Sequence, residues 1–193
     1  MRDAGFVVLG GNLLDAAVMK TSVISDDFRT RYLSRPGHEN VMECRAIVFE
    51  GPEDYHARIN DPSLDIDENC ILVIRGCGPV GYPGSAEVVN MQPPDALIKA
   101  GVRELPTLGD GRQSGTSGSP SILNAAPESA VGGGLAILRT GDMIRVDLNA
   151  CTIDMLVPTD ELLTRREALE LPELTHQTPW QELYRRYVGS LDT

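Results

Sequence analysis

Aromatic residues are scarce in this chain of 193 residues, because only 5% of them are Phe, Trp or Tyr. Its core must therefore be built from aliphatic side chains, and the hydrophobic content of 41% is that of an ordinary soluble globular protein. No apolar run approaches the roughly 18 residues that a membrane-spanning helix needs. The length falls within the single-domain range, so we expect one domain with one core.

Positive charge is also in short supply. The 17 Lys and Arg residues are outnumbered by 28 Asp and Glu residues, which gives a formal net charge of −11. Nucleic acid and anionic membranes repel a chain of this charge, so we expect neither as a partner. An acidic small-molecule substrate would be repelled as well, and local cations such as a bound metal ion would have to overcome that field.

Cysteine and histidine are too few and too scattered to mark a metal centre. The four cysteines have no CxxC or CxH spacing and fit no common zinc or iron–sulfur pattern. We expect them to be buried free thiols in a reducing cytosol. The three histidines stand far apart in polar surroundings and are expected at the surface. These residues are Cys44, Cys70, Cys77 and Cys151, and His38, His56 and His176.

Short β-branched runs recur along the chain, and Gly, Pro, Asn or Asp residues separate most of them, as is typical of strands. Helical patterns lie between some of the runs. The alternation predicts a mixed α/β fold in which about eight short strands form a mixed sheet that curls into a β-barrel flanked by helices. The expected strands are 6–9, 17–24, 46–49, 71–75, 105–108, 135–139, 143–148 and 152–157, and the expected helices are 26–33, 52–59, 94–99 and 160–169.

Two local signals refine this prediction. Thr140-Gly141-Asp142 lies between two of the apolar runs and predicts a hairpin turn. Thr178-Pro179-Trp180-Gln181 has the pattern of a capping box at the start of a helix with one apolar face. We therefore expect the barrel over about residues 5–170 and a helical extension over residues 171–193.

Residues Gly76 to Gly81 match the GxGxxG pattern of dinucleotide-binding folds and follow an apolar strand. Such a fold needs a helix to begin at this point, because the first amides of that helix hold the pyrophosphate. Pro79, Pro83 and Gly84 all fall inside the helix that would be required. We therefore reject a nucleotide site and predict a rigid, re-entrant loop that shapes a pocket.

The segment from Gly109 to Pro120 is the most informative part of the sequence. It contains four glycines, which let a backbone approach a ligand closely, and serines whose hydroxyls would be uncrowded. Composition alone would equally suit a flexible turn. No Lys follows the glycines, so the segment is not a Walker loop.

Together with residues 121–128, this segment resembles the signature of the dihydroxy-acid and sugar-acid dehydratases, a family that includes 6-phosphogluconate dehydratase. Residues 113–118 and 83–88 are similar to the aldonic-acid branch, the arabinonate and xylonate dehydratases. Other landmarks follow in the family's order over about residues 5–170. They are Gly11-Asn12-Leu13, Lys20-Thr21, Ile74-Arg75, Gly78-Pro79, Gly81-Tyr82-Pro83-Gly84, Gly132-Gly133-Gly134, Gly141-Asp142, Asp160-Glu161-Leu162 and Arg165-Arg166.

The resemblance implies the C-terminal domain, a β-barrel flanked by helices, of an Mg²⁺-dependent iron–sulfur hydro-lyase. Such enzymes dehydrate 2,3-dihydroxy sugar acids (aldonates) to 2-keto-3-deoxy acids, and they usually assemble as homo-oligomers. Their larger N-terminal domain carries the three cluster cysteines and most magnesium ligands, including a carbamylated lysine. These features are absent from the present residues. We therefore expect this chain to be catalytically incomplete alone and to need an N-terminal dehydratase domain as its partner.

The resemblance also assigns roles to four residues. Ser114 corresponds to the family's catalytic base, a serine thought to act as an alkoxide, and Glu87 corresponds to the magnesium ligand that this domain contributes. Arg112 and Thr116 are implied as substrate-binding residues. For Arg112, a structural pair with Asp110 that tightens the loop is an equal alternative. Glu87 also has the pattern of a surface residue that compensates the dipole at the start of a helix.

Two other functions stay open on the sequence alone. The chain could be a non-catalytic binding or assembly module that docks on a separately encoded N-terminal dehydratase domain. An exposed apolar face opposite the Ser114 loop would support that function. The chain could also be a serine hydrolase that uses Ser114, which would require a histidine within hydrogen-bond reach of the hydroxyl.

Overall fold

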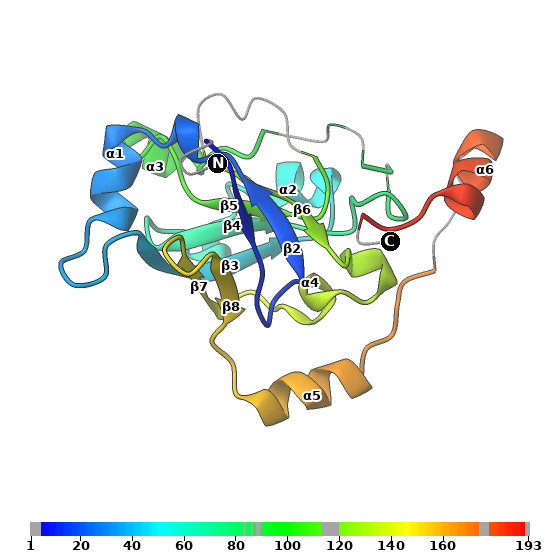
Figure 1. The fold of residues 1–193 in the computed structure, drawn as a ribbon. Helices are drawn as coiled ribbons and strands as arrows, with labels where there is room; N and C mark the ends of the chain where they lie inside the picture. Colours follow the sequence, from blue (N-terminus) through cyan, green and yellow to red (C-terminus); the bar gives the residue numbers. More distant parts are fainter. Residues whose placement is uncertain are drawn as a thin grey trace.

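The computed structural model describes residues 5–82, 84–85, 87, 90–112, 120–173 and 178–191, which form one mixed sheet flanked by helices (Figure 1). The strands are β1 (Val7–Leu9), β2 (Ala16–Met19), β3 (Val41–Phe49), β4 (Cys70–Ile74), β5 (Thr107–Gly109), β6 (Ile122–Ala126), β7 (Met143–Asp147) and β8 (Thr152–Met155). The α-helices are α1 (Asp26–Phe28), α2 (Pro52–Arg58), α3 (Asp95–Lys99), α4 (Gly134–Ile137), α5 (Thr159–Glu167) and α6 (Pro179–Tyr187). Shorter helical turns are η1 (Thr21–Val23), η2 (Arg29–Leu33), η3 (Pro62–Leu64) and η4 (Ser129–Val131).

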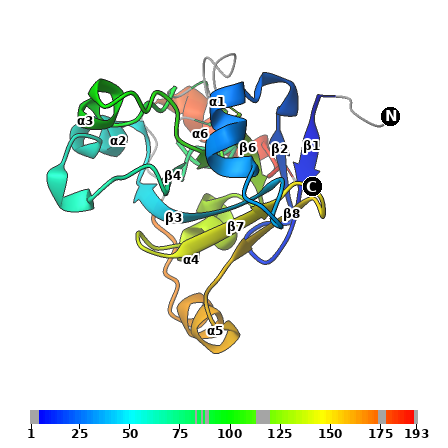
Figure 2. The same cartoon turned by 90° about the vertical axis from the view of Figure 1, so that its left-hand side faces the viewer.

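The eight strands follow the order β1-β2-β6-β5-β4-β3-β7-β8. The central strands β3 to β6 run parallel, whereas β1 and β2 on one side and β7 and β8 on the other are antiparallel. Gly10, directly after β1, bridges to Thr152 at the start of β8, so that the two edge strands meet. The sheet is therefore nearly closed into a barrel (Figure 2), which confirms the predicted fold class.

A side chain from the turn after β1 reinforces this closure. Asn12 Oδ1 accepts a hydrogen bond from the Met155 N–H (2.6 Å), and Asn12 Nδ2 donates to the Met155 carbonyl (3.0 Å). Gly11 must be glycine, because a Cβ atom there would lie 2.2 Å from the carbonyl oxygen of Ile153. The Gly11-Asn12 part of the dehydratase resemblance therefore joins the two edge strands of the barrel.

The core is aliphatic, as the scarcity of aromatic residues requires. All five residues of β4 are buried, which is typical of a central parallel strand covered on both faces. Phe28 and Phe49 are the largest of the fully buried side chains, and Phe49 packs edge-on against Tyr55 with 5.4 Å between ring centroids. None of the helices in the described ranges is long and apolar enough to cross a membrane.

Two predictions about elements are wrong. Residues 135–139 were expected as a strand but contribute to α4, because a short apolar run suits a buried helix or a strand equally well. Gly141 consequently turns the chain between α4 and β7, and no hairpin forms there. β6 was not predicted, since its alanines have low strand propensity and its Asn124 has a φ of 54°.

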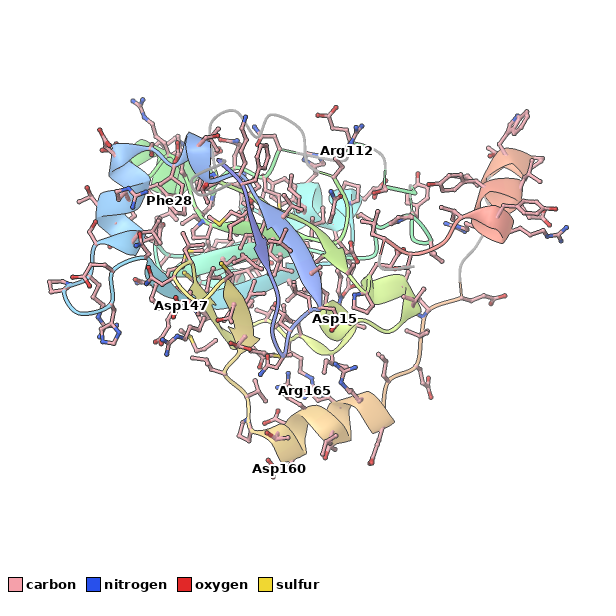
Figure 3. All side chains as sticks on the ribbon, in the orientation of Figure 1. Asp15, Phe28, Arg112, Asp147, Asp160 and Arg165 are labelled. Carbon is pink, nitrogen blue, oxygen red and sulfur yellow. The ribbon has the colours of Figure 1, made fainter. Side chains whose placement is uncertain are left out.

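A buried arginine fastens α5 to the barrel. Arg165 makes a bidentate pair with Asp142 (2.5 and 3.0 Å) and a second pair with Glu161 (2.6 Å). It also donates to the Ile137 carbonyl (3.1 Å), and its hydrogen bonds to Asp142 raise its pKa above the usual range. Figure 3 shows Arg165 reaching from α5 toward the sheet, whereas Asp160 points away. Asp142, Glu161 and Arg165, which come from three separate motifs of the dehydratase resemblance, thus form one ion-pair network.

We expect Arg165→Met to lower the free energy of unfolding by about 3 kcal/mol, because it leaves the largely buried Asp142 carboxylate without its partner. The matched control is Arg166→Met, since Arg166 is exposed and should change stability by less than about 0.5 kcal/mol. Urea unfolding followed by circular dichroism measures both. Equal losses in the two variants would show that the buried network does not hold α5.

Candidate functional site

The carboxyl ends of the four parallel strands meet at one end of the barrel. The loops that leave three of these ends carry Gly76 and Cys77 after β4, Asp110 to Arg112 after β5, and Glu128 and Ser129 after β6. Loops at the carboxyl ends of parallel strands are where α/β sheets bind ligands. This end of the barrel is therefore the candidate functional site.

Asp110 is wholly buried and joins all three loops. Its Oδ1 accepts a hydrogen bond from the Cys77 N–H (2.9 Å). Its Oδ2 accepts from the N–H groups of Gly76 (2.9 Å) and Ser129 (3.0 Å) and from the Ser129 hydroxyl (2.6 Å). A buried carboxylate is tolerated only when such donors replace water. In the described part of the chain no ion pair links Asp110 to Arg112, so Asp110 anchors loops instead of pairing with Arg112.

Glu128 is a second buried carboxylate that shapes the loop after β4. Its Oε1 accepts from the Val80 N–H (2.8 Å) and its Oε2 from the Gly81 N–H (3.0 Å). Gly78 must be glycine, because a Cβ atom there would lie 2.2 Å from Glu128 Oε2. No helix begins among the described residues of this loop, in agreement with the rejection of a nucleotide site. The central glycine of the GxGxxG pattern, Gly78, thus allows the Glu128 carboxylate to approach the backbone closely.

Glu128 ends the 121–128 part of the dehydratase signature, but the sequence assigned it no role, and Ser129 lies just outside that signature. They could have been found by their position, because a polar residue directly after a buried strand faces the loops of the neighbouring strands. That argument requires β6 to be recognised as a strand, and β6 is the element that the sequence pattern missed. The two omissions therefore have one cause.

A cavity of about 270 Å³ opens beside the loop after β4. Gly76, Tyr82 and Ser129 line it on the barrel side, and residues 169–172 line it on the other. Most of its lining is apolar, and neither Glu87 nor Arg112 contributes to it. The cavity is therefore distinct from the positions of Glu87 and Arg112.

The structure brings together two of the four predicted site residues. Glu87 and Arg112 form an isolated parallel bridge, and both side chains are exposed. The sequence pattern suggested that Glu87 lies at the start of a helix. In the structure Glu87 lies on a β-bridge instead. Ser114 and Thr116 lie outside the described residues.

Glu87 can offer one carboxylate to a metal ion. Mg²⁺ usually takes one or two protein carboxylates together with substrate oxygens, so an exposed Glu fits as a single ligand. Asp110 and Glu128 are committed to backbone amides. Among the described residues, no group of three or more His, Cys, Asp or Glu could hold a metal ion. A complete magnesium site would therefore need ligands from elsewhere.

The cysteines do not suit a metal or cluster site. Cys44, Cys70 and Cys77 are buried as predicted, but Cys151 is exposed because it lies in the turn between β7 and β8. Burial raises the pKa of Cys44 to about 12 and that of Cys70 to about 11. Burial also raises the pKa of Cys77, and the nearby Asp110 carboxylate raises it further. Cluster ligation requires thiolates, which these environments disfavour.

The two described histidines, His38 and His56, are exposed as predicted, and His176 lies outside the described residues. His38 precedes β3 and therefore lies at the amino end of the parallel strands, away from Arg112 at their carboxyl end. This position gives no support to a serine–histidine pair that involves His38.

With this geometry in place, comparison with known proteins identifies the family. The family model for the C-terminal domain of dihydroxy-acid/6-phosphogluconate dehydratases matches residues 1–193. The chain belongs to this dehydratase family. That assignment agrees with the resemblance seen in the Gly109 to Pro120 segment.

Individual relatives are named sugar-acid dehydratases. The chain is 64% identical to D-xylonate dehydratase of Caulobacter vibrioides over 98% of its own length and 32% of that relative. It is 42% identical to L-arabinonate dehydratase of Rhizobium leguminosarum over 98% of its length and 31% of the relative. It is 40% identical to 6-deoxy-6-sulfo-D-gluconate dehydratase of Pseudomonas putida, covering 96% and 30%. The chain therefore spans about a third of the length of these relatives.

We expect only Cys151 to react with iodoacetamide in the native chain at about pH 8. Only the thiolate is alkylated, and a pKa of about 11 leaves about one Cys70 thiol in a thousand ionised at that pH. Intact mass spectrometry should count one adduct in native buffer and four in denaturant. Rapid addition of a second adduct under native conditions would contradict the described burial.

We expect Asp110→Asn to lower the free energy of unfolding by about 2–4 kcal/mol, because the Asn amide group would face backbone donors. The loop held by Asp110 should also open more often, so that Cys77 becomes alkylated faster. Asp15→Asn is the control, since Asp15 is exposed. Unchanged stability and unchanged labelling of Cys77 would remove Asp110 from its anchoring role.

Proposed function

We propose that this chain is the C-terminal domain of an aldonate dehydratase and supplies the serine base and one magnesium ligand of its active site. The observation that carries the proposal is the bridge between Glu87 and Arg112 at the carboxyl end of the parallel strands. Two of the four residues that the resemblance assigns to the site are neighbours there. Arg112 also precedes Ser114 by only two residues in the sequence.

The substrate class follows from the relatives and from charge. The relatives above are named for D-xylonate, L-arabinonate and 6-deoxy-6-sulfo-D-gluconate, all of which are sugar acids. A substrate carboxylate needs a local cation in a chain with a net charge of −11, and the exposed Arg112 guanidinium provides one. We therefore propose that Arg112 and Thr116 bind a small aldonate substrate.

The reaction is the loss of water from a 2,3-dihydroxy acid. Ser114 would take the proton from C2 through its hydroxyl oxygen, and the C3 hydroxyl would leave as water. The enol that results would tautomerise to a 2-keto-3-deoxy acid. Serine is a very weak acid, so its deprotonated form needs cationic surroundings and amide donors, which the neighbouring Arg112 and a glycine-rich backbone can supply.

The proposed cofactors are Mg²⁺ and an iron–sulfur cluster. When bound, they would supply Lewis-acid polarisation of the substrate oxygens. Glu87 would contribute one magnesium ligand. The buried, protonated cysteines of this chain do not fit the cluster, which we assign to the N-terminal dehydratase domain. The complete enzyme would accordingly require that domain as partner and would assemble as a homo-oligomer.

An assembly module without catalytic function is the second candidate. It is favoured by one observation, the exposed apolar face of α6, which suits docking on a larger partner. The two candidates share the partner but differ in whether the Ser114 hydroxyl is needed for turnover.

The test is a chimera in which this chain replaces the corresponding third of the Caulobacter vibrioides D-xylonate dehydratase. Prepared anaerobically, it should convert D-xylonate or L-arabinonate to a 2-keto-3-deoxy acid. Loss of a general base typically costs 10²–10⁴-fold, so Ser114→Ala should lower kcat by about a thousandfold. Ser117→Ala, in the same segment, is the matched control and should keep most of the activity.

Full activity of the Ser114→Ala chimera would exclude Ser114 as the base and favour the assembly module. Glu87→Gln should lower the activity and raise the Mg²⁺ concentration needed for half-maximal rate, since one anionic ligand is lost. Labelling of Ser114 by a fluorophosphonate probe in the isolated chain would instead support the serine hydrolase.

A further inference from the structure

The apolar face of α6 is an exposed hydrophobic feature that the proposed site does not use. Trp180 is 78% exposed and Tyr187 is 77% exposed, with Leu183 at 48% and Tyr184 at 46%. These residues are spaced i, i+3, i+4 and i+7, so they lie on one side of the helix. Together with Val188 they line a shallow apolar depression.

The helix itself is well specified. Thr178 and Gln181 form the predicted capping box, with hydrogen bonds of 3.3 Å to the Gln181 N–H and 3.0 Å from the Thr178 N–H. Pro179 occupies the first helical position. Nevertheless α6 has only nine residues, and isolated helices shorter than about 12 residues are marginal in water. Stable formation of α6 therefore needs a surface against which its apolar face can pack.

The barrel does not provide that surface. Figure 1 shows α6 away from the sheet, on the side of the barrel opposite α1. Its contacts run along one edge, where Arg185 lies 3.4 Å from the Gly81 carbonyl oxygen. Tyr184 lies so close to Gly84 that a Cβ atom there would be 3.1 Å from the ring. Apart from this contact of Tyr184, the apolar face is exposed, and none of the residues of α6 is buried.

The position of α6 indicates what covers it. Gly81 and Gly84 belong to the loop that leads to Glu87, the single carboxylate that this chain offers to the magnesium site. Whatever completes that site must approach the same end of the barrel. The relatives are about three times as long as this chain, and the matching family model is that of a C-terminal domain. We therefore expect one and the same domain to complete the magnesium site and to cover α6.

We propose that the apolar face of α6 docks into an apolar groove of the N-terminal dehydratase domain, and so fixes that domain over the Glu87 end of the barrel. The proposal rests on the proposed function, because the partner is defined by it. A second copy of this chain is the competing occupant.

Trp180 gives a specific probe, because it is the one tryptophan of the chain. The chain is labelled with fluorotryptophan, alone and within the chimera with the Caulobacter vibrioides enzyme, and Trp180→Phe assigns its resonance. In fluorine NMR the Trp180 signal of the isolated chain should show a large H₂O/D₂O solvent shift. In the chimera we expect most of that solvent shift to be lost.

Variants on the same face test the contact. Leu183→Asp and Tyr187→Asp in the chimera should restore the solvent shift of Trp180. With the two domains as separate proteins, each variant should raise their Kd by about tenfold or more, as expected for a central apolar contact. Leu163→Asp is the matched control, since Leu163 on α5 is 56% exposed and should leave both measurements unchanged.

The outcomes separate this inference from the proposed function. Burial of Trp180 together with an inactive chimera supports docking and counts against the catalytic assignment. A Trp180 that stays solvent-exposed in the chimera, active or not, overturns the docking of α6. Burial of Trp180 in the isolated chain at rising protein concentration, with dimers in sedimentation, also overturns it, because the occupant would then be a second copy.

Discussion

Asp110 holds a buried negative charge at the point where the loops after β4, β5 and β6 converge, and the geometry of the candidate site depends on how that charge is satisfied. Three N–H groups and one hydroxyl replace the water that the carboxylate gives up. They come from two other loops, so neither loop can move without leaving the charge partly unpaired. Gly111 and Arg112 directly follow Asp110, so the backbone is held in place at the point from which the chain continues toward Ser114.

The carboxylates at this end of the barrel divide into two kinds by environment. Asp110 and Glu128 are buried and fully engaged by backbone amides, so they determine loop shape. Glu87 is exposed, and its backbone forms a bridge to Arg112, so its side chain can bind a ligand. Residue type alone does not separate these roles. What separates them is the desolvation cost, which commits a buried carboxylate to its donors and leaves an exposed one free to exchange water for a metal ion.

The barrel was predictable because β-branched runs punctuated by Gly and Pro are a local signal of strands. The helix α4 and the strand β6 were not, because their identity depends on tertiary contacts. In α4, Gly134 lies so close to Leu13 that a Cβ atom would be 1.8 Å from its carbonyl oxygen. In β6, the left-handed Asn124 is tolerated because the strand is paired on both sides. For the site, a motif could indicate Glu87 and Arg112, but the anchoring roles of Asp110 and Glu128 required the loops to be seen together.

The described barrel satisfies the buried carboxylates at the candidate site, whereas Glu87 and most of the apolar face of α6 stay exposed, and both properties have physical causes. Its edge strands meet at Gly10 and Thr152, and its buried carboxylates find donors within the chain, so the barrel needs nothing from outside to satisfy these groups. By contrast, no cluster of metal-ligating side chains surrounds the exposed Glu87 carboxylate in the described chain, and most of the apolar face of α6 stays exposed. One is a charge too isolated to hold a metal ion, and the other is a helix too short to be stable unpacked. Because both features adjoin the loop from Gly76 to Gly84, one partner surface at this end of the barrel would satisfy them together.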